Sequence, residues 1–86
     1  MPNVEIYTQS FCPYCERAVA LLAKKGVQFN EIDAAYGSKA RETARERSGG
    51  RTSAPQIFIA GQHIGGCDEL MALDRAGKLD AMLGLA

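Results

Sequence analysis

The 86-residue sequence predicts a small α/β domain. Two strand-like runs, 4–8 and 27–32, flank a segment in which apolar residues recur at helical spacing. Two further short runs, 56–59 and 62–64, are separated by Ala60-Gly61, which reads as a tight turn. A strand, helix and strand of this length form a parallel unit with a right-handed crossover, whereas a tight turn makes the last two strands antiparallel. We therefore expect a sheet that contains both strand directions.

The first predicted helix follows directly on the first strand. Pro13 suits its first position, because the N–H that proline lacks would be unpaired there anyway. Lys24-Lys25-Gly26 ends it with charge that matches the helix dipole and with a terminal glycine. The run that follows, 27–32, alternates apolar and polar residues and predicts the second strand.

The second half of the chain predicts three more helices around the hairpin. Ser38 can cap a helix that runs to about Arg47, after a loop over 33–37. Gly65-Gly66 opens a helix over 67–76, and the apolar residues of 79–83 allow a last short helix. The charged residues of the middle helix are interpreted as a solvated face with i,i+3 and i,i+4 pairs: Arg41, Glu42, Arg45 and Glu46.

Charge and composition exclude several classes of protein. Ten basic and ten acidic side chains give a formal charge of zero, which argues against nucleic acid or an acidic membrane as the main partner. The chain has no run of eighteen apolar residues, and Met1 to Val4 lacks the charged and apolar segments of a signal peptide. Three cysteines, one close pair and one distant thiol, are typical of a redox protein in a reducing compartment. We expect a cytoplasmic monomer.

The most informative motif is Cys12-Pro13-Tyr14-Cys15, which lies between the first strand and the first helix. With Pro13 at the first helical position, Cys12 falls at the N-cap, where free N–H groups and the helix dipole favour a thiolate. Cys15 lies one turn deeper and should be shielded, whereas we expect the Cys12 sulfur at the helix end to be exposed. A stabilised thiolate leaves more readily than it attacks, which suits an exchange catalyst. The alternative is that the cysteines only fill the core, and for Cys67 alone we favour that interpretation.

Three motifs occur along the chain in a fixed order: the cysteine pair, Ser53-Ala54-Pro55 followed by Gln56-Ile57-Phe58-Ile59, and Gly65-Gly66-Cys67-Asp68. In this order they resemble the dithiol glutaredoxins, and the likeness extends over residues 4–70. The resemblance implies a thioredoxin-like fold, with a four-stranded mixed sheet flanked by helices on both faces. It also implies a single domain over residues 1–86.

The resemblance further implies a glutathione-dependent thiol–disulfide oxidoreductase that has no tightly bound cofactor and uses glutathione as its reducing co-substrate. In a one-cysteine route, Cys12 takes glutathione from a glutathionylated protein and a second glutathione releases it. In a two-cysteine route, Cys12 attacks a protein disulfide and Cys15 resolves the mixed disulfide. Ribonucleotide reductase is among the protein partners that the family suggests.

A glutathione site is implied as well. Ala54-Pro55 matches the family's cis-proline loop, whose residue before proline pairs through its backbone with the substrate cysteine; an ordinary trans proline is the alternative. The helix start at 66–68 would hold the γ-glutamyl carboxylate, with Asp68 facing the ligand's ammonium, although an acid there also caps a helix. Arg51 could meet the glycine carboxylate, and Tyr14 would form a wall. The implied glutathione-binding residues are Tyr14, Arg51, Ser53, Ala54, Pro55, Gly66, Cys67 and Asp68.

One departure from the family and three alternative functions follow from the same residues. Gln9-Ser10-Phe11 stands where many relatives carry a lysine, so we expect weaker glutathione binding or a less stabilised thiolate. The alternatives are an electron donor reduced by thioredoxin reductase, a protein that binds a glutathione-ligated iron–sulfur cluster, and a zinc module; we expect no metal. His63 is predicted to be a strand surface residue and Cys67 a small residue at a helix start. The zinc module would use Cys12, Cys15, His63 and Cys67.

Overall fold

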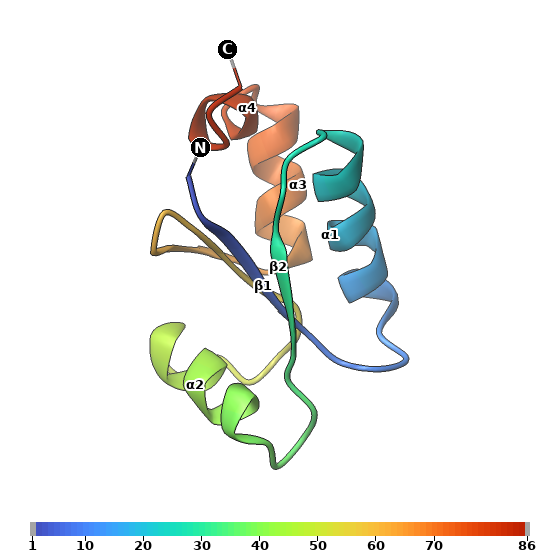
Figure 1. Ribbon diagram of the computed structural model, residues 1–86, viewed down its shortest axis with the longest axis vertical. Helices are drawn as coiled ribbons and strands as arrows, with labels where there is room; N and C mark the ends of the chain where they lie inside the picture. The colour runs from blue at the N-terminus through green and yellow to red at the C-terminus, as the bar shows by residue number, and fades with distance from the viewer. Residues whose placement is uncertain (1, 86) are drawn as a thin grey trace.

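The structure of the protein is a computed structural model, which describes residues 2–85. A strand–helix–strand unit comes first, and a hairpin and two C-terminal helices follow a central helix (Figure 1). The strands are β1 (Val4–Thr8), β2 (Asn30–Asp33), β3 (Gln56–Ile59) and β4 (Gln62–Gly65). The helices are α1 (Pro13–Lys24), α2 (Lys39–Arg47), α3 (Cys67–Arg75) and α4 (Leu79–Met82).

The four strands form one mixed sheet in the order β2-β1-β3-β4. β1 runs parallel to β2 and antiparallel to β3, and β3 pairs with β4 as an antiparallel hairpin. β1 is therefore an internal strand, and its C-terminal end leads directly into the loop before α1. This confirms the predicted mixed sheet and the placement of the cysteine motif at the end of a central strand.

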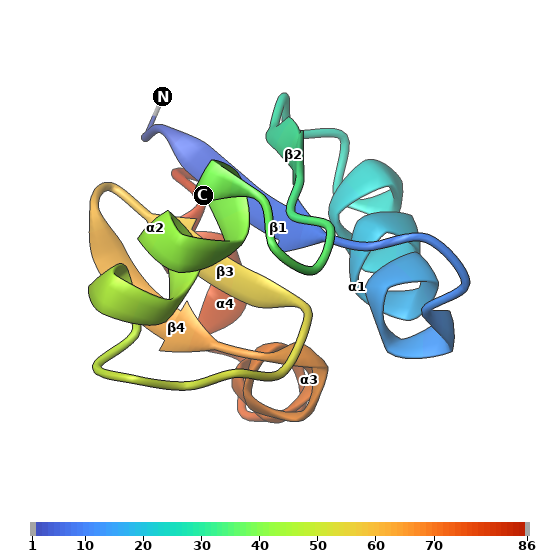
Figure 2. The ribbon, with the colours of Figure 1, turned by 90° about the horizontal axis from the view of Figure 1, so that it is seen from below.

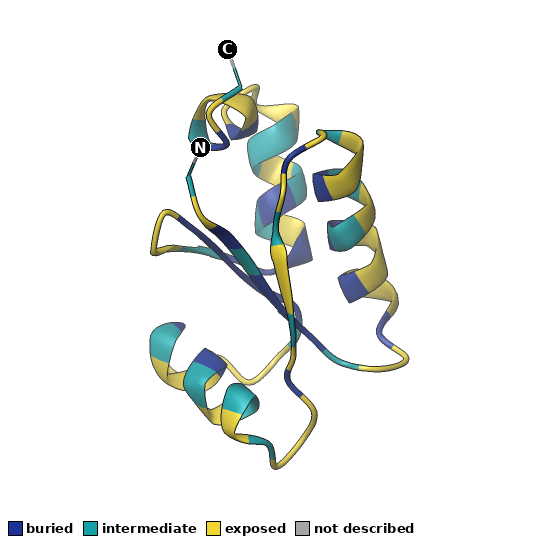
Figure 3. Cartoon of the chain, viewed as in Figure 1, coloured by how far each residue is buried: buried dark blue, intermediate teal, exposed yellow. Residues whose placement is uncertain are grey.

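Helices cover both faces of the sheet, as predicted. α1 and α3 lie on one face with α4 beside them, and α2 lies on the other (Figures 1 and 2). Successive residues of a strand face opposite sides, so β1 and β3 contribute to both cores, and buried residues follow the two strands through the middle of the molecule (Figure 3). The larger core contains Val4, Ile6, Ala18, Leu22, Val27, Ile57, Ile59, Cys67, Leu70, Leu79 and Leu83. The smaller core, under α2, contains Tyr7, Ala34, Ala44 and Phe58.

The second strand is shorter than predicted and shifted along the chain. Pairing with β1 begins at Asn30, opposite Glu5, whereas the apolar pattern predicted a strand over 27–32. Phe29 packs against the larger core and Ile32 against the smaller one. The apolar side chains of this segment therefore point to opposite faces of the sheet. For that reason, the alternation of apolar and polar residues did not show at which residue the backbone begins to pair with β1.

The helix boundaries follow the predicted signals. The Ser38 Oγ accepts a hydrogen bond from the Arg41 N–H at 3.1 Å and so caps α2. Gly26 and Gly77, with φ of 76° and 72°, follow the ends of α1 and α3. Within residues 2–85, no helix combines the length and apolar composition needed to cross a membrane.

Candidate active site

Cys12 lies at the N-cap of α1, as predicted. Its backbone is extended, with φ −120° and ψ 98°, and Pro13 is the first helical residue. The Cys12 Sγ accepts a hydrogen bond from the Cys15 N–H at 3.2 Å. The sulfur thus pairs with one of the N–H groups that a helix leaves free at its start, at the positive end of the helix dipole.

The side chain of Cys12 is less accessible than predicted. Cys12 is 7% exposed and Cys15 is 3% exposed, so the expectation of an exposed nucleophile beside a shielded partner is wrong for Cys12. The reason is the proline loop, because the Cys12 Sγ lies 3.8 Å from the carbonyl oxygen of Ala54. Burial, and then the neighbouring Cys12 sulfur, raise the pKa of Cys15 to about 12. Cys15 is therefore a shielded thiol at neutral pH, as predicted.

The peptide bond between Ala54 and Pro55 is cis, which confirms the prediction made from the motif. The loop is held from below by Gln56, a buried polar residue of β3 that is 1% exposed. Its Nε2 donates to the carbonyl oxygen of Ser53 at 2.9 Å, and its Oε1 lies 2.8 Å from the Nε2 of His63. The role of Gln56 was not predicted from the sequence, because its contact with His63 forms only when β3 pairs with β4.

His63 is half-buried rather than on the strand surface. Its ring lies 5.0 Å from the Phe58 ring, between centroids, as well as against Gln56. Burial, and then the positive charge of Arg51, lower the pKa of His63. His63 therefore supports the strand beneath the proline loop as a neutral ring at neutral pH.

The eight residues that the resemblance implied for glutathione binding line one groove, with a volume of about 170 Å³. They come from the start of α1, the proline loop and the start of α3. The floor of the groove is narrow, because a Cβ added to Gly66 would lie 3.2 Å from the carbonyl oxygen of Pro55. The lining residues are Tyr14, Arg51, Ser53, Ala54, Pro55, Gly66, Cys67, Asp68 and Glu69.

Glu69 is the lining residue that sequence analysis missed. Its Oε1 accepts a hydrogen bond from the Gly66 N–H at 2.6 Å and lies 3.0 Å from the Nη1 of Arg51. The hydrogen bond from Gly66, and then that from Arg51, lower the pKa of Glu69 despite its partial burial. An acid three residues after the N-cap is the pattern of a capping box, which could have identified it. Arg51 is thus held at the groove by a carboxylate of the same chain.

The sequence-based interpretation of Arg41 as part of a solvated face is wrong. Its Nη1 donates to the carbonyl oxygen of Ala34 at 3.1 Å and to the Oε1 of Gln9, and its Nη2 donates to the carbonyl oxygen of Thr52 at 2.7 Å. The guanidinium therefore joins the loop before α1, the loop after β2 and the loop before Pro55. The other charged residues of α2 interpreted as solvated are exposed, as predicted: Glu42, Arg45 and Glu46.

The third cysteine, Cys67, is the first residue of α3 and is 6% exposed, as expected for a small residue at a helix start. Burial, and then the charge of Asp68, raise its pKa. All three cysteines are free thiols. Among residues 2–85, no group of three or more histidine, cysteine or acidic side chains is placed to hold a metal ion, so the four side chains considered for zinc do not converge.

Comparison with known proteins identifies the family of this chain. A glutaredoxin family model matches residues 4–64. Glutaredoxin 3 from Escherichia coli (strain K12) is 58% identical over 83 residues, which cover 96% of this chain and 99% of the relative. The chain belongs to the glutaredoxin family. As a glutaredoxin, it is a glutathione-dependent thiol–disulfide oxidoreductase with glutathione as its reducing co-substrate.

Solved structures of glutaredoxins share this fold. The solution structure of glutaredoxin from Brucella melitensis superimposes with a TM-score of 0.84 at 57% identity, covering 96% of this chain and 89% of that one. The crystal structure of a buckwheat glutaredoxin–glutathione complex gives a TM-score of 0.86 at 29% identity, covering 99% and 83%. The predicted thioredoxin-like fold is thereby confirmed.

Proposed function

We propose that Cys12 is the nucleophile of this glutaredoxin in both of its reactions. The observation that carries the proposal is the N-cap geometry, in which the Cys12 sulfur accepts the Cys15 N–H while burial keeps Cys15 a thiol. In the one-cysteine route, the Cys12 thiolate attacks the glutathione sulfur of a mixed disulfide and releases the substrate thiolate. A second glutathione thiolate then attacks the Cys12–glutathione disulfide, which forms oxidised glutathione and restores Cys12.

Cys15 serves the two-cysteine route. The Cys12 thiolate attacks a protein disulfide, breaks its S–S bond and forms a mixed disulfide with one substrate sulfur. Cys15 loses its proton and attacks the Cys12 sulfur, which releases the second substrate thiol and leaves a Cys12–Cys15 disulfide. Two molecules of glutathione then reduce this disulfide. The raised pKa of Cys15 supports the order of events, because a protonated thiol does not compete with Cys12 as the first nucleophile.

Glutathione is proposed to lie in the groove between the proline loop and α3. The free N–H groups at the start of α3 would bind its γ-glutamyl carboxylate, and the exposed Asp68 would face its ammonium. Arg51 would meet the glycine carboxylate, sharing its guanidinium with Glu69. The backbone of Ala54 would pair with the cysteinyl unit, next to the Cys12 sulfur. Tyr14, which is 55% exposed, would cover the ligand from the α1 side.

The protein substrates of this reaction are proposed as chemical classes. We propose glutathionylated proteins and protein disulfides as substrates, with ribonucleotide reductase as one candidate, in the cytoplasm. The open groove supports this range of substrates, because its lining residues would contact the glutathione unit and leave the remainder of the substrate outside. We propose that the protein acts as a monomer and that the chain forms one domain.

The test is the glutathione-dependent reduction of a small glutathione mixed disulfide by the wild type, Cys12→Ser and Cys15→Ser, with glutathione reductase in excess. Cys12→Ser should lose all activity above background, and Cys15→Ser should keep activity comparable to the wild type. On a protein disulfide, both variants should be inactive in multiple turnover. Retained activity of Cys12→Ser on the small substrate would contradict the assignment.

A further inference from the structure

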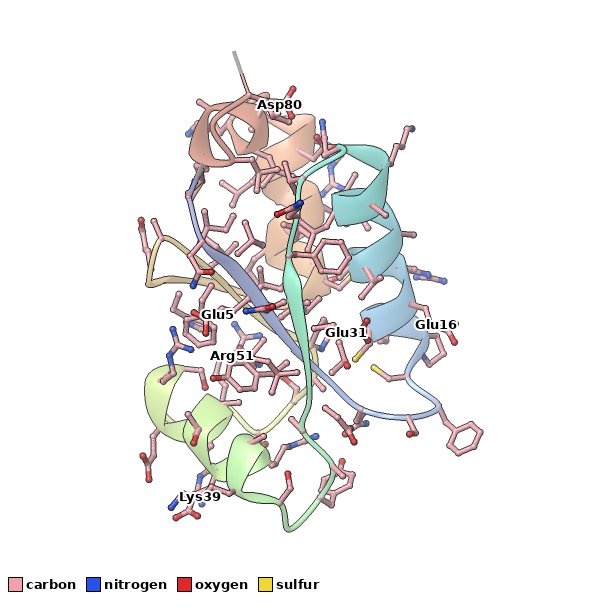
Figure 4. All side chains as sticks on the ribbon, in the orientation of Figure 1. Glu5, Glu16, Glu31, Lys39, Arg51 and Asp80 are labelled. Atoms are coloured by element: carbon pink, nitrogen blue, oxygen red, sulfur yellow. The ribbon has the colours of Figure 1, made fainter. Side chains whose placement is uncertain are left out.

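A second groove lies next to the cysteine motif, on the side formed by the β1–α1 loop, α1 and β2. It has a volume of about 230 Å³ and, unlike the glutathione groove, contains both cysteines of the motif. Two of its residues, Glu16 and Glu31, are exposed carboxylates from different elements, and they lie near the sulfur atoms in Figure 4. The lining residues are Gln9, Ser10, Phe11, Cys12, Cys15, Glu16, Val19 and Glu31.

Phe11 forms the rim of this groove and is fully exposed, at 100%. Its φ is 56°, in the left-handed region that non-glycine residues rarely adopt. Phe11 therefore makes no packing contribution to the core, and its backbone conformation is one that a glycine would adopt more easily. A large apolar side chain held in solvent beside a reactive sulfur is typical of a surface that a partner covers.

The charge of the groove distinguishes it from the glutathione groove. Its lining contains two glutamates and neither lysine nor arginine, whereas the glutathione groove combines Arg51 with Asp68 and Glu69. Glu31 is held in place by a hydrogen bond that its Oε2 accepts from the Thr8 Oγ1 at 3.0 Å. Such a surface favours a basic partner segment, because complementary charge at the rim of an interface steers and selects partners.

We propose that this groove binds the polypeptide segment around the target disulfide of a protein substrate, with a basic residue next to the attacked cysteine and an apolar residue against Phe11. The inference rests on the proposed two-cysteine route. The attacked cysteine itself would lie beside Ala54, as the cysteinyl unit of glutathione would, and the residues that flank it would extend into this groove. Cys15 lines the groove as well, and because displacement at sulfur is in line, it would attack the Cys12 sulfur from the side opposite the bound substrate sulfur.

The test uses two synthetic peptides with an internal disulfide and a leucine near one cysteine. They are identical except that the residues flanking that cysteine are lysines in one peptide and glutamates in the other. Pre-reduced protein is mixed with each peptide in a single turnover, in which the peptide gains two electrons and the protein forms the Cys12–Cys15 disulfide. The measured quantity is the ratio of the two second-order rate constants, which cancels any change in the reactivity of Cys12.

For the wild type, we expect the lysine peptide to react about three- to tenfold faster at low salt, with a smaller ratio in 0.5 M NaCl. Glu16→Gln/Glu31→Gln should bring the ratio close to one. Glu46→Gln, which removes the same charge from the exposed face of α2, is the matched control and should keep the wild-type ratio. Asparagine tolerates a positive φ, so Phe11→Asn should keep the turn while removing the aromatic ring. It should lower the rate constants for both peptides several-fold, whereas Phe11→Tyr should keep them near the wild-type values.

A wild-type ratio of one, or a ratio that the double substitution leaves unchanged, would overturn the proposal. So would a Phe11→Asn protein that reduces both peptides at the wild-type rate. Because the single turnover requires no glutathione, its result is independent of the glutathione assay. A protein without glutathione-dependent turnover but with a charge-dependent ratio would sink the proposed function and leave the groove assignment intact.

Discussion

The N-termini of α1 and α3 both contribute to the groove beside the proline loop, and they are capped in different ways. At α1 the cap is a side chain, the Cys12 sulfur, which accepts the Cys15 N–H. At α3 the cap is Gly66, which has no side chain, and the Glu69 carboxylate reaches back to its N–H instead. The same arrangement of free N–H groups thus faces a thiol at one helix and a carboxylate of the same chain at the other, because the residue at the N-cap decides what occupies it. In the proposed function, the first serves chemistry and the second binds ligand.

The largest expected effect on activity comes from adding a side chain at Gly66, the N-cap of α3. Gly66→Val places carbon atoms where the carbonyl oxygen of Pro55 is only 3.2 Å and the Arg51 Nη2 3.6 Å from the added Cβ. We expect KM for a small glutathione mixed disulfide to rise about tenfold, which is ~1.4 kcal/mol, with little change in kcat. Gly66→Ala should show the same trend less strongly. Steady-state kinetics at pH 7 check this, and a fall in kcat at constant KM would assign chemistry rather than binding to this end.

At the α1 end, the raised pKa of Cys15 predicts a loss of stability in alkali. A folded-state pKa above the unfolded value means that stability is fully present below about pH 8.5, the unfolded value, and falls as the pH rises toward about 12. Urea unfolding of the reduced protein between pH 7 and 10.5 should show a steeper decline for the wild type than for Cys15→Ser. Parallel curves for the two proteins would argue that Cys15 is not desolvated.

At the α3 end, the pH dependence has the opposite sign. The lowered pKa of Glu69 means that its contribution to stability is present above about pH 4.3, the unfolded value, and is lost as the pH falls through the lower folded value. Glu69→Gln should therefore be less stable than the wild type at pH 7, and the difference should disappear in acid. The effect is modest, because the ion pair with Arg51 is over 40% exposed on both sides. A difference that is independent of pH would mean that the charge of Glu69 is not involved.

The smallest expected effect concerns the missing lysine at position 9. Gln9 accepts a hydrogen bond from Arg41, so a lysine there would face a guanidinium. Gln9→Lys alone should leave KM for the glutathione substrate nearly unchanged. In an Arg41→Gln background, the same substitution should lower KM about two- to threefold, since the ammonium can then turn toward the ligand. Arg45→Gln, an exposed arginine of the same helix, is the control background. A two- to threefold lower KM for Gln9→Lys with Arg41 still present would show that the two cations do not repel each other.

Most residues that line the groove between the proline loop and α3 were predictable from the sequence, because three motifs, far apart in the chain, resemble those of the glutaredoxins in the same order. Sequence analysis derived the N-cap position of Cys12 from Pro13 and the start of α3 from Gly65-Gly66, which are local signals. It missed Arg41 and Gln56 because their partners lie in other segments. Arg41 donates to Thr52, and Gln56 contacts His63 across the hairpin.

The sequence by itself determined the order of elements and the N-cap residues of α1, α2 and α3, since periodicity, glycine, proline and capping residues act over a few positions. The residues that line the groove followed from the resemblance of three motifs to the glutaredoxins. Only the tertiary structure decided where β2 begins to pair, how little of Cys12 is exposed and which carboxylate holds Arg51. Each of these depends on two segments that meet in space: β1 with β2, α1 with the proline loop, and that loop with α3. A pattern along one segment carries no information about the other segment that completes the contact.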